Sequence, residues 1–169
     1  MFKRIVIGVA ALAAMPSALP APASGPGATQ AEVSITVKDK PLQLQRDEQV
    51  AFMFVIAMSD LENECTQHAG RGCTLDELAS GGIPSKDRWQ IGHLKFDPRT
   101  SDPNYTYTLN AGEKNWEVKA TPQKPGLGGF YVVGSGMFPK VLYNPKGEAS
   151  IASTETDGYS ISGDSFKAD

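Results

Sequence analysis

The stretch over residues 49–61, which reads QVAFMFVIAMSDL, is the densest apolar run after the N-terminus. Six of its residues recur at the three- and four-residue spacing of one helix face: Val50, Met53, Phe54, Ala57, Met58 and Leu61. Three more apolar residues fill much of the remaining circumference: Phe52, Val55 and Ile56. A helix that is apolar nearly all round is normally buried on more than one side, and a run of about 13 residues is too short to span a bilayer. The stretch therefore predicts a central helix inside the protein.

Acidic residues lie at both ends of this predicted helix. Asp47 is the expected N-cap, because its side chain can accept a hydrogen bond from the first turn. Asp60, Glu62 and Glu64 lie near the C-terminal end, where the helix dipole disfavours negative charge. We expect the helix to fray there, with these carboxylates in solvent. A calcium site is the alternative, since calcium prefers oxygen ligands, but the Asp/Asn/Gly loop pattern of such sites is missing.

The N-terminus has the pattern of a secretory signal peptide. It consists of a basic pair, an apolar run and a small-x-small cleavage site: Lys3–Arg4, residues 5–15 and Ala21-Pro22-Ala23. We therefore predict a Sec-type signal peptide over residues 1–23, a flexible leader over residues 24–30, and a periplasmic or extracellular location. No later segment has the length of a membrane span, so none is expected in the mature chain.

The charge of the chain argues against two classes of partner. The whole sequence has 16 basic and 19 acidic residues. Removal of Lys3 and Arg4 with the signal peptide leaves 14 basic and 19 acidic residues, a net charge of −5. Because no basic block or basic–aromatic stripe remains, binding to nucleic acid or to an anionic membrane is not expected.

Several segments after residue 30 alternate between apolar and polar residues, as half-buried strands do. Two precede the central helix: residues 31–37 and a short segment around Leu42 and Leu44. Four follow it: two hairpin strands over residues 105–109 and 116–120, a third strand over 130–133 and a fourth over 137–143, in which Pro139 favours an edge position.

These segments predict an α+β fold class, with one main helix packed on a small antiparallel sheet of about four strands. We expect a single domain over residues 31–143. Residues 144–169 are rich in Gly, Ser, Thr, Asp and Glu, so we expect them to form a disordered or loosely attached tail.

Cys65 and Cys73 are the two cysteines of the chain, and in an exported protein such a pair is typical of a disulfide. A zinc site is the alternative, with Cys65, His68 and Cys73 as ligands and His93 or a carboxylate as the fourth, but the spacing matches no strong zinc signature. Thr74 and Glu77 form a capping-box pattern that predicts a short helix to about Ala79.

The order of these elements resembles the globular head of type IV pilins and type II secretion pseudopilins. The resemblance covers residues 47–138 and depends on short motifs: Tyr105-Thr-Tyr-Thr-Leu109, Trp116-Glu-Val-Lys-Ala120-Thr-Pro122, Gly129-Phe130-Tyr131 and a Gly turn at Gly134 and Gly136. It implies a pilin-like head. The family's leader cleavage site, and the Phe and Glu of its long apolar stem, have no counterparts here, so the resemblance does not imply a filament subunit and no functional residue is carried over.

No catalytic motif is present, so we predict no catalytic residue, no metal and no cofactor. The leading interpretation is an exported, non-enzymatic, pilin-like binding or structural module with a protein partner in the cell envelope, such as a secretion or pilus-type assembly. Its expected binding residues are aromatic, since aromatic anchors dominate interfaces: Tyr105, Tyr107, Trp116 and Phe130.

One alternative is a small periplasmic hydrolase or a ligand- or metal-binding protein, with His68 and His93 meeting nearby carboxylates in one pocket. Another is an envelope protein of no definable molecular activity.

Overall fold

The computed structural model describes residues 32–83, 85–86, 91–135 and 139–162. The predicted signal peptide and leader, over residues 1–23 and 24–30, lie outside the described residues, as do positions 137 and 138 of the predicted fourth strand. Among the described helices, none is long and apolar enough to cross a membrane.

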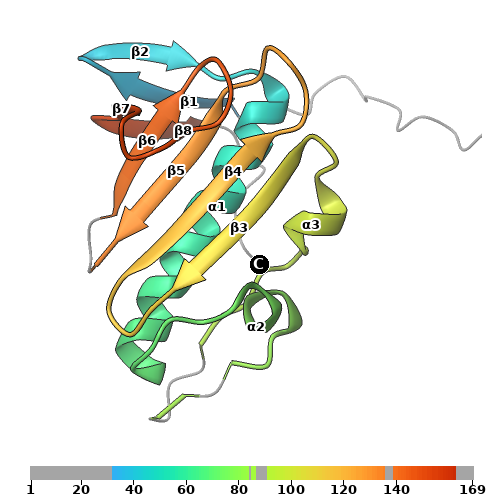
Figure 1. The fold of residues 1–169 in the computed structure, drawn as a ribbon, viewed down its shortest axis with the longest axis vertical. Coiled ribbons are helices and arrows are strands. Elements are labelled where there is room, and N and C mark those ends of the chain that lie inside the picture. Colours follow the sequence, from blue (N-terminus) through green and yellow to red (C-terminus); the bar gives the residue numbers. More distant parts are fainter. Residues whose placement is uncertain (1–31, 84, 87–90, 136–138, 163–169) are drawn as a thin grey trace, which may run out of the picture.

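The described chain forms two antiparallel sheets (Figure 1). The larger sheet has the order β3 (Tyr105–Ala111), β4 (Trp116–Pro122), β5 (Gly129–Gly134), β6 (Lys140–Asn144) and β7 (Thr154–Glu155). The smaller sheet has the order β2 (Lys40–Gln43), β1 (Glu32–Val37) and β8 (Gly158–Ser162). The helical elements are α1 (Arg46–Glu64), a π-helical turn η1 (Cys65–Ala69), α2 (Leu75–Ser80) and α3 (Pro98–Ser101).

The predicted fold, with one small sheet of about four strands, is therefore wrong. The five-stranded sheet gains β7, and the two strands before α1 form a separate three-stranded sheet with β8. The sequence did not predict β7 and β8 because residues 144–169 are mostly Gly, Ser, Thr, Asp and Glu, with few apolar residues to mark a strand. Pro139 also does not mark an edge, since β6 lies between β5 and β7.

The described part of the expected tail is paired rather than disordered. In β8, Tyr159 pairs with Ile35 and Ile161 pairs with Val33 across an antiparallel ladder. Val33 and Ile35 are fully buried on β1. Tyr159 and Ile161, two apolar residues at alternating positions, are enough for the tail to complete this sheet. The polar composition of the rest of the tail gave no sign of this strand in the sequence.

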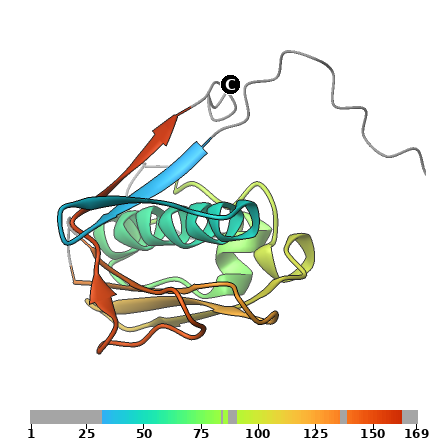
Figure 2. The same ribbon diagram turned by 90° about the horizontal axis from the view of Figure 1, so that it is seen from above.

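Helix α1 lies between the two sheets (Figure 2). Phe52 marks the centre of this arrangement. Its ring centroid is 5.4 Å from that of Phe130 on β5 and 5.2 Å from that of Tyr159 on β8, and both pairs meet edge to face. The nearly all-round apolar surface of α1 is thus covered from two opposite directions, as the sequence predicted for this helix.

The start of α1 differs from the prediction, because Gln45 and not Asp47 is the N-cap. The backbone N–H of Gln45 donates to Oε2 of Glu48 at 2.8 Å. Glu48 therefore caps the helix from inside its first turn. The sequence alone does not show whether Asp47 or Glu48 has this role, because the two acidic residues are adjacent. By contrast, α2 begins at the predicted capping box, with Thr74 N–H donating to Glu77 Oε2 at 2.8 Å.

Replacing Phe52 with alanine tests the sandwiched position of α1. We expect Phe52→Ala to lower the free energy of unfolding by about 3–5 kcal/mol, because the cavity opens between both sheets. Urea unfolding followed by circular dichroism measures this loss. Phe96→Ala is the matched control, since Phe96 is 60% exposed, and its loss should stay below about 1 kcal/mol. Equal losses in the two variants would contradict the placement of Phe52.

Candidate functional site

The four aromatic residues expected to bind a partner are all buried: Tyr105, Tyr107, Trp116 and Phe130. Each is at most 5% exposed and belongs to the core cluster around α1. The hydroxyl of Tyr105 donates to the carbonyl of Gly128 at 2.8 Å, and that of Tyr107 donates to Asp102 Oδ2 at 2.6 Å. Their expected role as binding residues would require an exposed patch, and their burial argues against it. Strand alternation showed that these residues share a face but not that this face is the one that packs on the helix.

The disulfide between Cys65 and Cys73 is present, as predicted. Its Cα atoms are 5.9 Å apart, and it ties the end of α1 to the segment before α2. Because both sulfur atoms are paired, they are not the thiolate ligands that the zinc alternative required. The bond fits an oxidising compartment, such as the periplasm or the extracellular space.

Glu62 is fully buried beside this disulfide. Its two carboxylate oxygens each accept the backbone N–H of Cys73 at 3.2 Å. Burial raises the pKa of Glu62 from 4.5 to about 7, against the lowering effect of the Cys73 amide.

The other two carboxylates near the end of α1 have different surroundings. Glu64 accepts the N–H of Gly92 at 3.0 Å, and Asp60 is exposed. The three carboxylates of the calcium alternative therefore face different surroundings. Within the described part of the chain, no group of three or more His, Cys, Asp or Glu residues could hold a metal.

The two histidines lie at separate places in the fold. His68 is half-buried within η1, and His93 is exposed with its ring against Gly81, where an added Cβ would come within 3.3 Å of the imidazole. Neither lines either of the two cavities described below. The pocket that the hydrolase alternative required, shared by both histidines, is not formed by either cavity.

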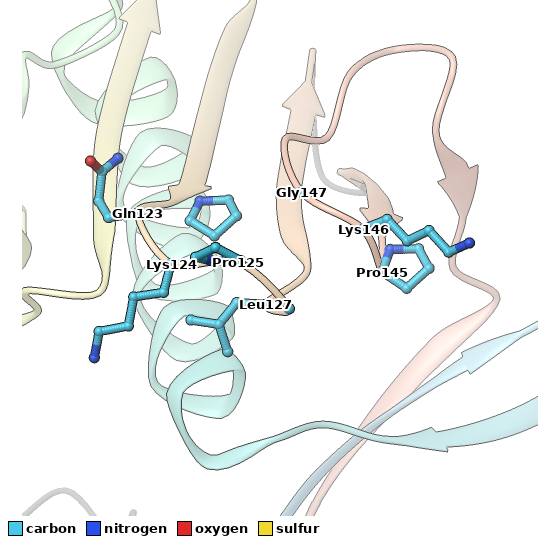
Figure 3. A pocket seen from close by; sticks show the side chains of 9 residues that line it. Gln123, Lys124, Pro125, Leu127, Pro145, Lys146 and Gly147 are labelled. Atoms are coloured by element: carbon cyan, nitrogen blue, oxygen red, sulfur yellow. The ribbon is translucent and has the colours of Figure 1, made fainter.

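The first cavity lies between the β4–β5 and β6–β7 loops (Figure 3). It has a volume of about 450 Å³ and is lined by residues 122–127 and 145–147. Its two lysines, Lys124 and Lys146, extend in opposite directions away from it, as Figure 3 shows. Glu48 lies close by but is buried, and its Oε1 accepts the N–H of Gly128 at 2.7 Å and the hydroxyl of Tyr143 at 3.0 Å. This cavity thus lacks the converging polar groups of a binding site.

The second cavity, which we call the α1 groove, is larger and mostly apolar. It has a volume of about 660 Å³ and combines three parts of the chain: Glu32, Val33, Gln43 and Leu44 around β1 and β2; Arg46, Gln49, Val50, Met53, Phe54 and Ala57 on α1; and Leu94, Lys95 and Phe96 before α3. Its apolar helix residues follow three- and four-residue spacing, so they form one stripe. At its rim Val50 is 42% and Phe96 is 60% exposed.

Sequence reasoning missed this groove. The sequence predicts Val50, Met53 and Ala57 on one apolar face of a buried helix. They do share one face of α1, but Val50 is exposed and Met53 and Ala57 are only half-buried. What the sequence did not show is that the described parts of the two sheets leave this side of α1 partly exposed. A helix that is apolar all round, in a chain with short strands, is a signal that part of its surface can stay uncovered.

No family model, curated protein or solved structure matches the chain. The resemblance to pilin and pseudopilin heads therefore stays a prediction.

Glu62 makes the stability of the protein depend on pH. The folded state keeps this carboxyl protonated up to about pH 7, whereas the unfolded state ionises at its ordinary pKa of 4.5. Between these values the folded state binds more protons, so stability should fall as pH rises from 4.5 to 7 and then level off, by about 3 kcal/mol in total from this group. Urea unfolding across this range measures the fall.

Glu62→Gln is the test variant, because glutamine keeps an acceptor for Cys73 and does not titrate. We expect a flatter pH profile than that of the unchanged protein, with the variant more stable above pH 7. Glu77, whose hydrogen bonds with Arg71 lower its pKa to about 2, titrates below this window. Parallel profiles for the two proteins would contradict the assignment.

Proposed function

We propose that this chain is an exported, non-enzymatic binding module that holds an apolar ligand in the α1 groove. The proposal depends on the groove itself, in which a partly exposed apolar stripe of α1 lies beside lining residues from the β1–β2 region and from residues 94–96. The signal-peptide pattern and the disulfide support export.

The size and lining of the α1 groove suit a ligand. Its volume of about 660 Å³ falls within the range of roughly 300–1,000 Å³ that is typical of small-molecule sites. Such sites are mainly apolar with a few placed polar groups, and here Met53, Phe54 and Ala57 line the groove together with polar residues at its ends. Cover over Val50 and Phe96 would remove exposed apolar surface from water, which favours binding.

The lining supports binding more than catalysis. Its titratable side chains are Glu32, Arg46 and Lys95, and no His, Cys, Ser or Thr is among its described residues. The serine-, cysteine- or threonine-based nucleophile and histidine base that many hydrolases use are therefore not among the described lining residues. The hydrolase alternative placed its chemistry at His68 and His93, which lie outside this groove.

A protein partner in the cell envelope stays a prediction from the sequence. The four aromatic residues expected to contact it are buried and no longer support it. The partner-binding surface that remains is the α1 groove, with Phe96 as its most exposed aromatic residue.

A charge placed in the α1 groove tests the proposal. The neutral apolar fluorophore Nile red should bind the unchanged protein, with a blue-shifted emission. Val50→Glu should weaken this binding about tenfold or more, because the new carboxylate must be desolvated beside the probe. Glutamate suits an exposed helix position, so the variant should keep its stability within about 0.5 kcal/mol.

Leu42→Glu is the matched control. Leu42 lies on β2 and is 39% exposed, close to the 42% of Val50, but it does not line the groove. This variant should bind Nile red as the unchanged protein does. Absence of Nile red binding to the unchanged protein, or equal losses in both variants, would overturn the proposed function.

A further inference from the structure

We propose that the ligand of the α1 groove is a single-chain fatty acid, whose acyl chain lies along the helix stripe and whose carboxylate meets Arg46. This inference rests on the proposed binding function and names the class of ligand. It follows from the shape of the groove floor, from the charges on its rim and from the charge of the whole chain.

The floor of the groove follows one face of α1. Its helix residues extend from Arg46 through Val50 to Ala57. At a rise of 1.5 Å per residue the floor from Arg46 to Ala57 is about 16 Å long, of which the apolar stripe from Val50 to Ala57 makes up about 10 Å. The β1–β2 side forms one wall with Val33 and Leu44, and residues 94–96 form part of the lining from the other direction. A linear hydrocarbon chain fits a floor of this form better than a compact ring system does.

Arg46 gives the floor a charged end. It is exposed and occupies the first position of α1, where the helix dipole disfavours a cation. It makes no ion pair with the described residues. Its position is therefore not explained by the stability of the helix. A ligand with an anionic head and an apolar chain would use both Arg46 and the stripe that begins one turn later.

The rest of the rim adds to the positive potential. Lys95 also lines the groove, with its ammonium nitrogen 5.9 Å from the ring centroid of Phe96. Glu32 is the carboxylate of the described lining, so two cations face one anion. Gln49 lies between Arg46 and the stripe, and its Nε2 donates to the carbonyl of Leu44 at 2.8 Å, which holds the wall of the groove to the helix.

The charge of the whole chain favours a free fatty acid over the surface of a bilayer. The sequence has a net charge of −3, so an anionic membrane repels the protein at long range. The stripe also lies between walls, where a single chain can enter and a flat surface makes less contact. The source of the ligand is thus a monomeric fatty acid and not a lipid headgroup.

Three ligands with the same chain test this inference: dodecanoate, dodecanol and dodecylammonium. The two ions are titrated below their micelle concentrations and dodecanol below its solubility limit, all at low salt, by displacement of Nile red. We expect dodecanoate to bind about fivefold more tightly than dodecanol, and dodecylammonium to bind more weakly than dodecanol. The preference for dodecanoate should shrink as salt is added, because the charges lie at an exposed rim.

Variants locate the carboxylate. Arg46→Gln should reduce dodecanoate affinity about fivefold and leave dodecanol affinity unchanged. Lys95→Gln should act in the same direction with a smaller effect of about twofold. Lys114→Gln is the matched control, because Lys114 is exposed between β3 and β4 and does not line the groove. It should change neither affinity.

The outcomes separate the inference from the proposed function. Equal affinities for dodecanoate and dodecanol, with Nile red still bound, would overturn the fatty-acid assignment and leave the binding function intact. Failure of all three ligands and of Nile red would overturn both. Sedimentation of the protein with phosphatidylglycerol vesicles at comparable affinity would replace the free fatty acid with a membrane surface.

Discussion

Helix α1 is apolar on nearly all its sides, and the rest of the structure depends on this constraint. Such a helix must be covered from more than one direction. The five-stranded sheet covers one side through Phe130, and the smaller sheet covers another through Val33, Ile35 and Tyr159. The second sheet joins β1 and β8 from opposite ends of the described chain. The α1 groove lies where this cover stops, so the candidate site is a consequence of the same constraint.

Three carboxylates of α1 fix the surrounding loops to the helix; Glu48 and Glu62 are buried and Glu64 is half-buried. Near its start, Glu48 accepts N–H groups from Gln45 and from Gly128, the residue before β5. Near its end, Glu62 and Glu64 accept N–H groups from Cys73 and Gly92. A buried carboxylate costs free energy unless it is hydrogen-bonded, and each of these uses a backbone amide of a distant loop. In this way the helix positions the disulfide segment and the chain that leads to residues 94–96 of the groove.

Local signals in the sequence predicted much of this fold. The stripe of α1, the alternation of β1 and of the β3–β4 hairpin, the capping box of Thr74 and the cysteine pair each depend on residues that are close in the chain. The errors concern contacts between distant residues. Tyr159 and Ile161 acquire their role only from Ile35 and Val33, which precede them by more than 120 positions. Composition alone made the same segment look disordered.

The candidate site could not be predicted from the sequence, because it too depends on contacts between distant residues. Alternation in β3 and β4 shows that the aromatic residues share a face, but which face is open depends on where α1 packs. The groove likewise depends on how far each sheet extends over the helix. Phe96 and Arg46 are 50 positions apart in the sequence, and no local pattern connects them. Only the folded structure shows that both line one groove together with Val50 and Met53.

The central claim is that the uncovered stripe of α1 is where this protein binds its ligand. The most direct measurement is a methyl NMR titration with dodecanoate, which reports each apolar residue separately. We expect concentration-dependent shifts for the methyl groups of Val50, Met53 and Ala57, with Val118 and Val132 in the core unchanged. Shifts confined to Leu127 at the other cavity, or no shift at any of these methyl groups, would contradict it.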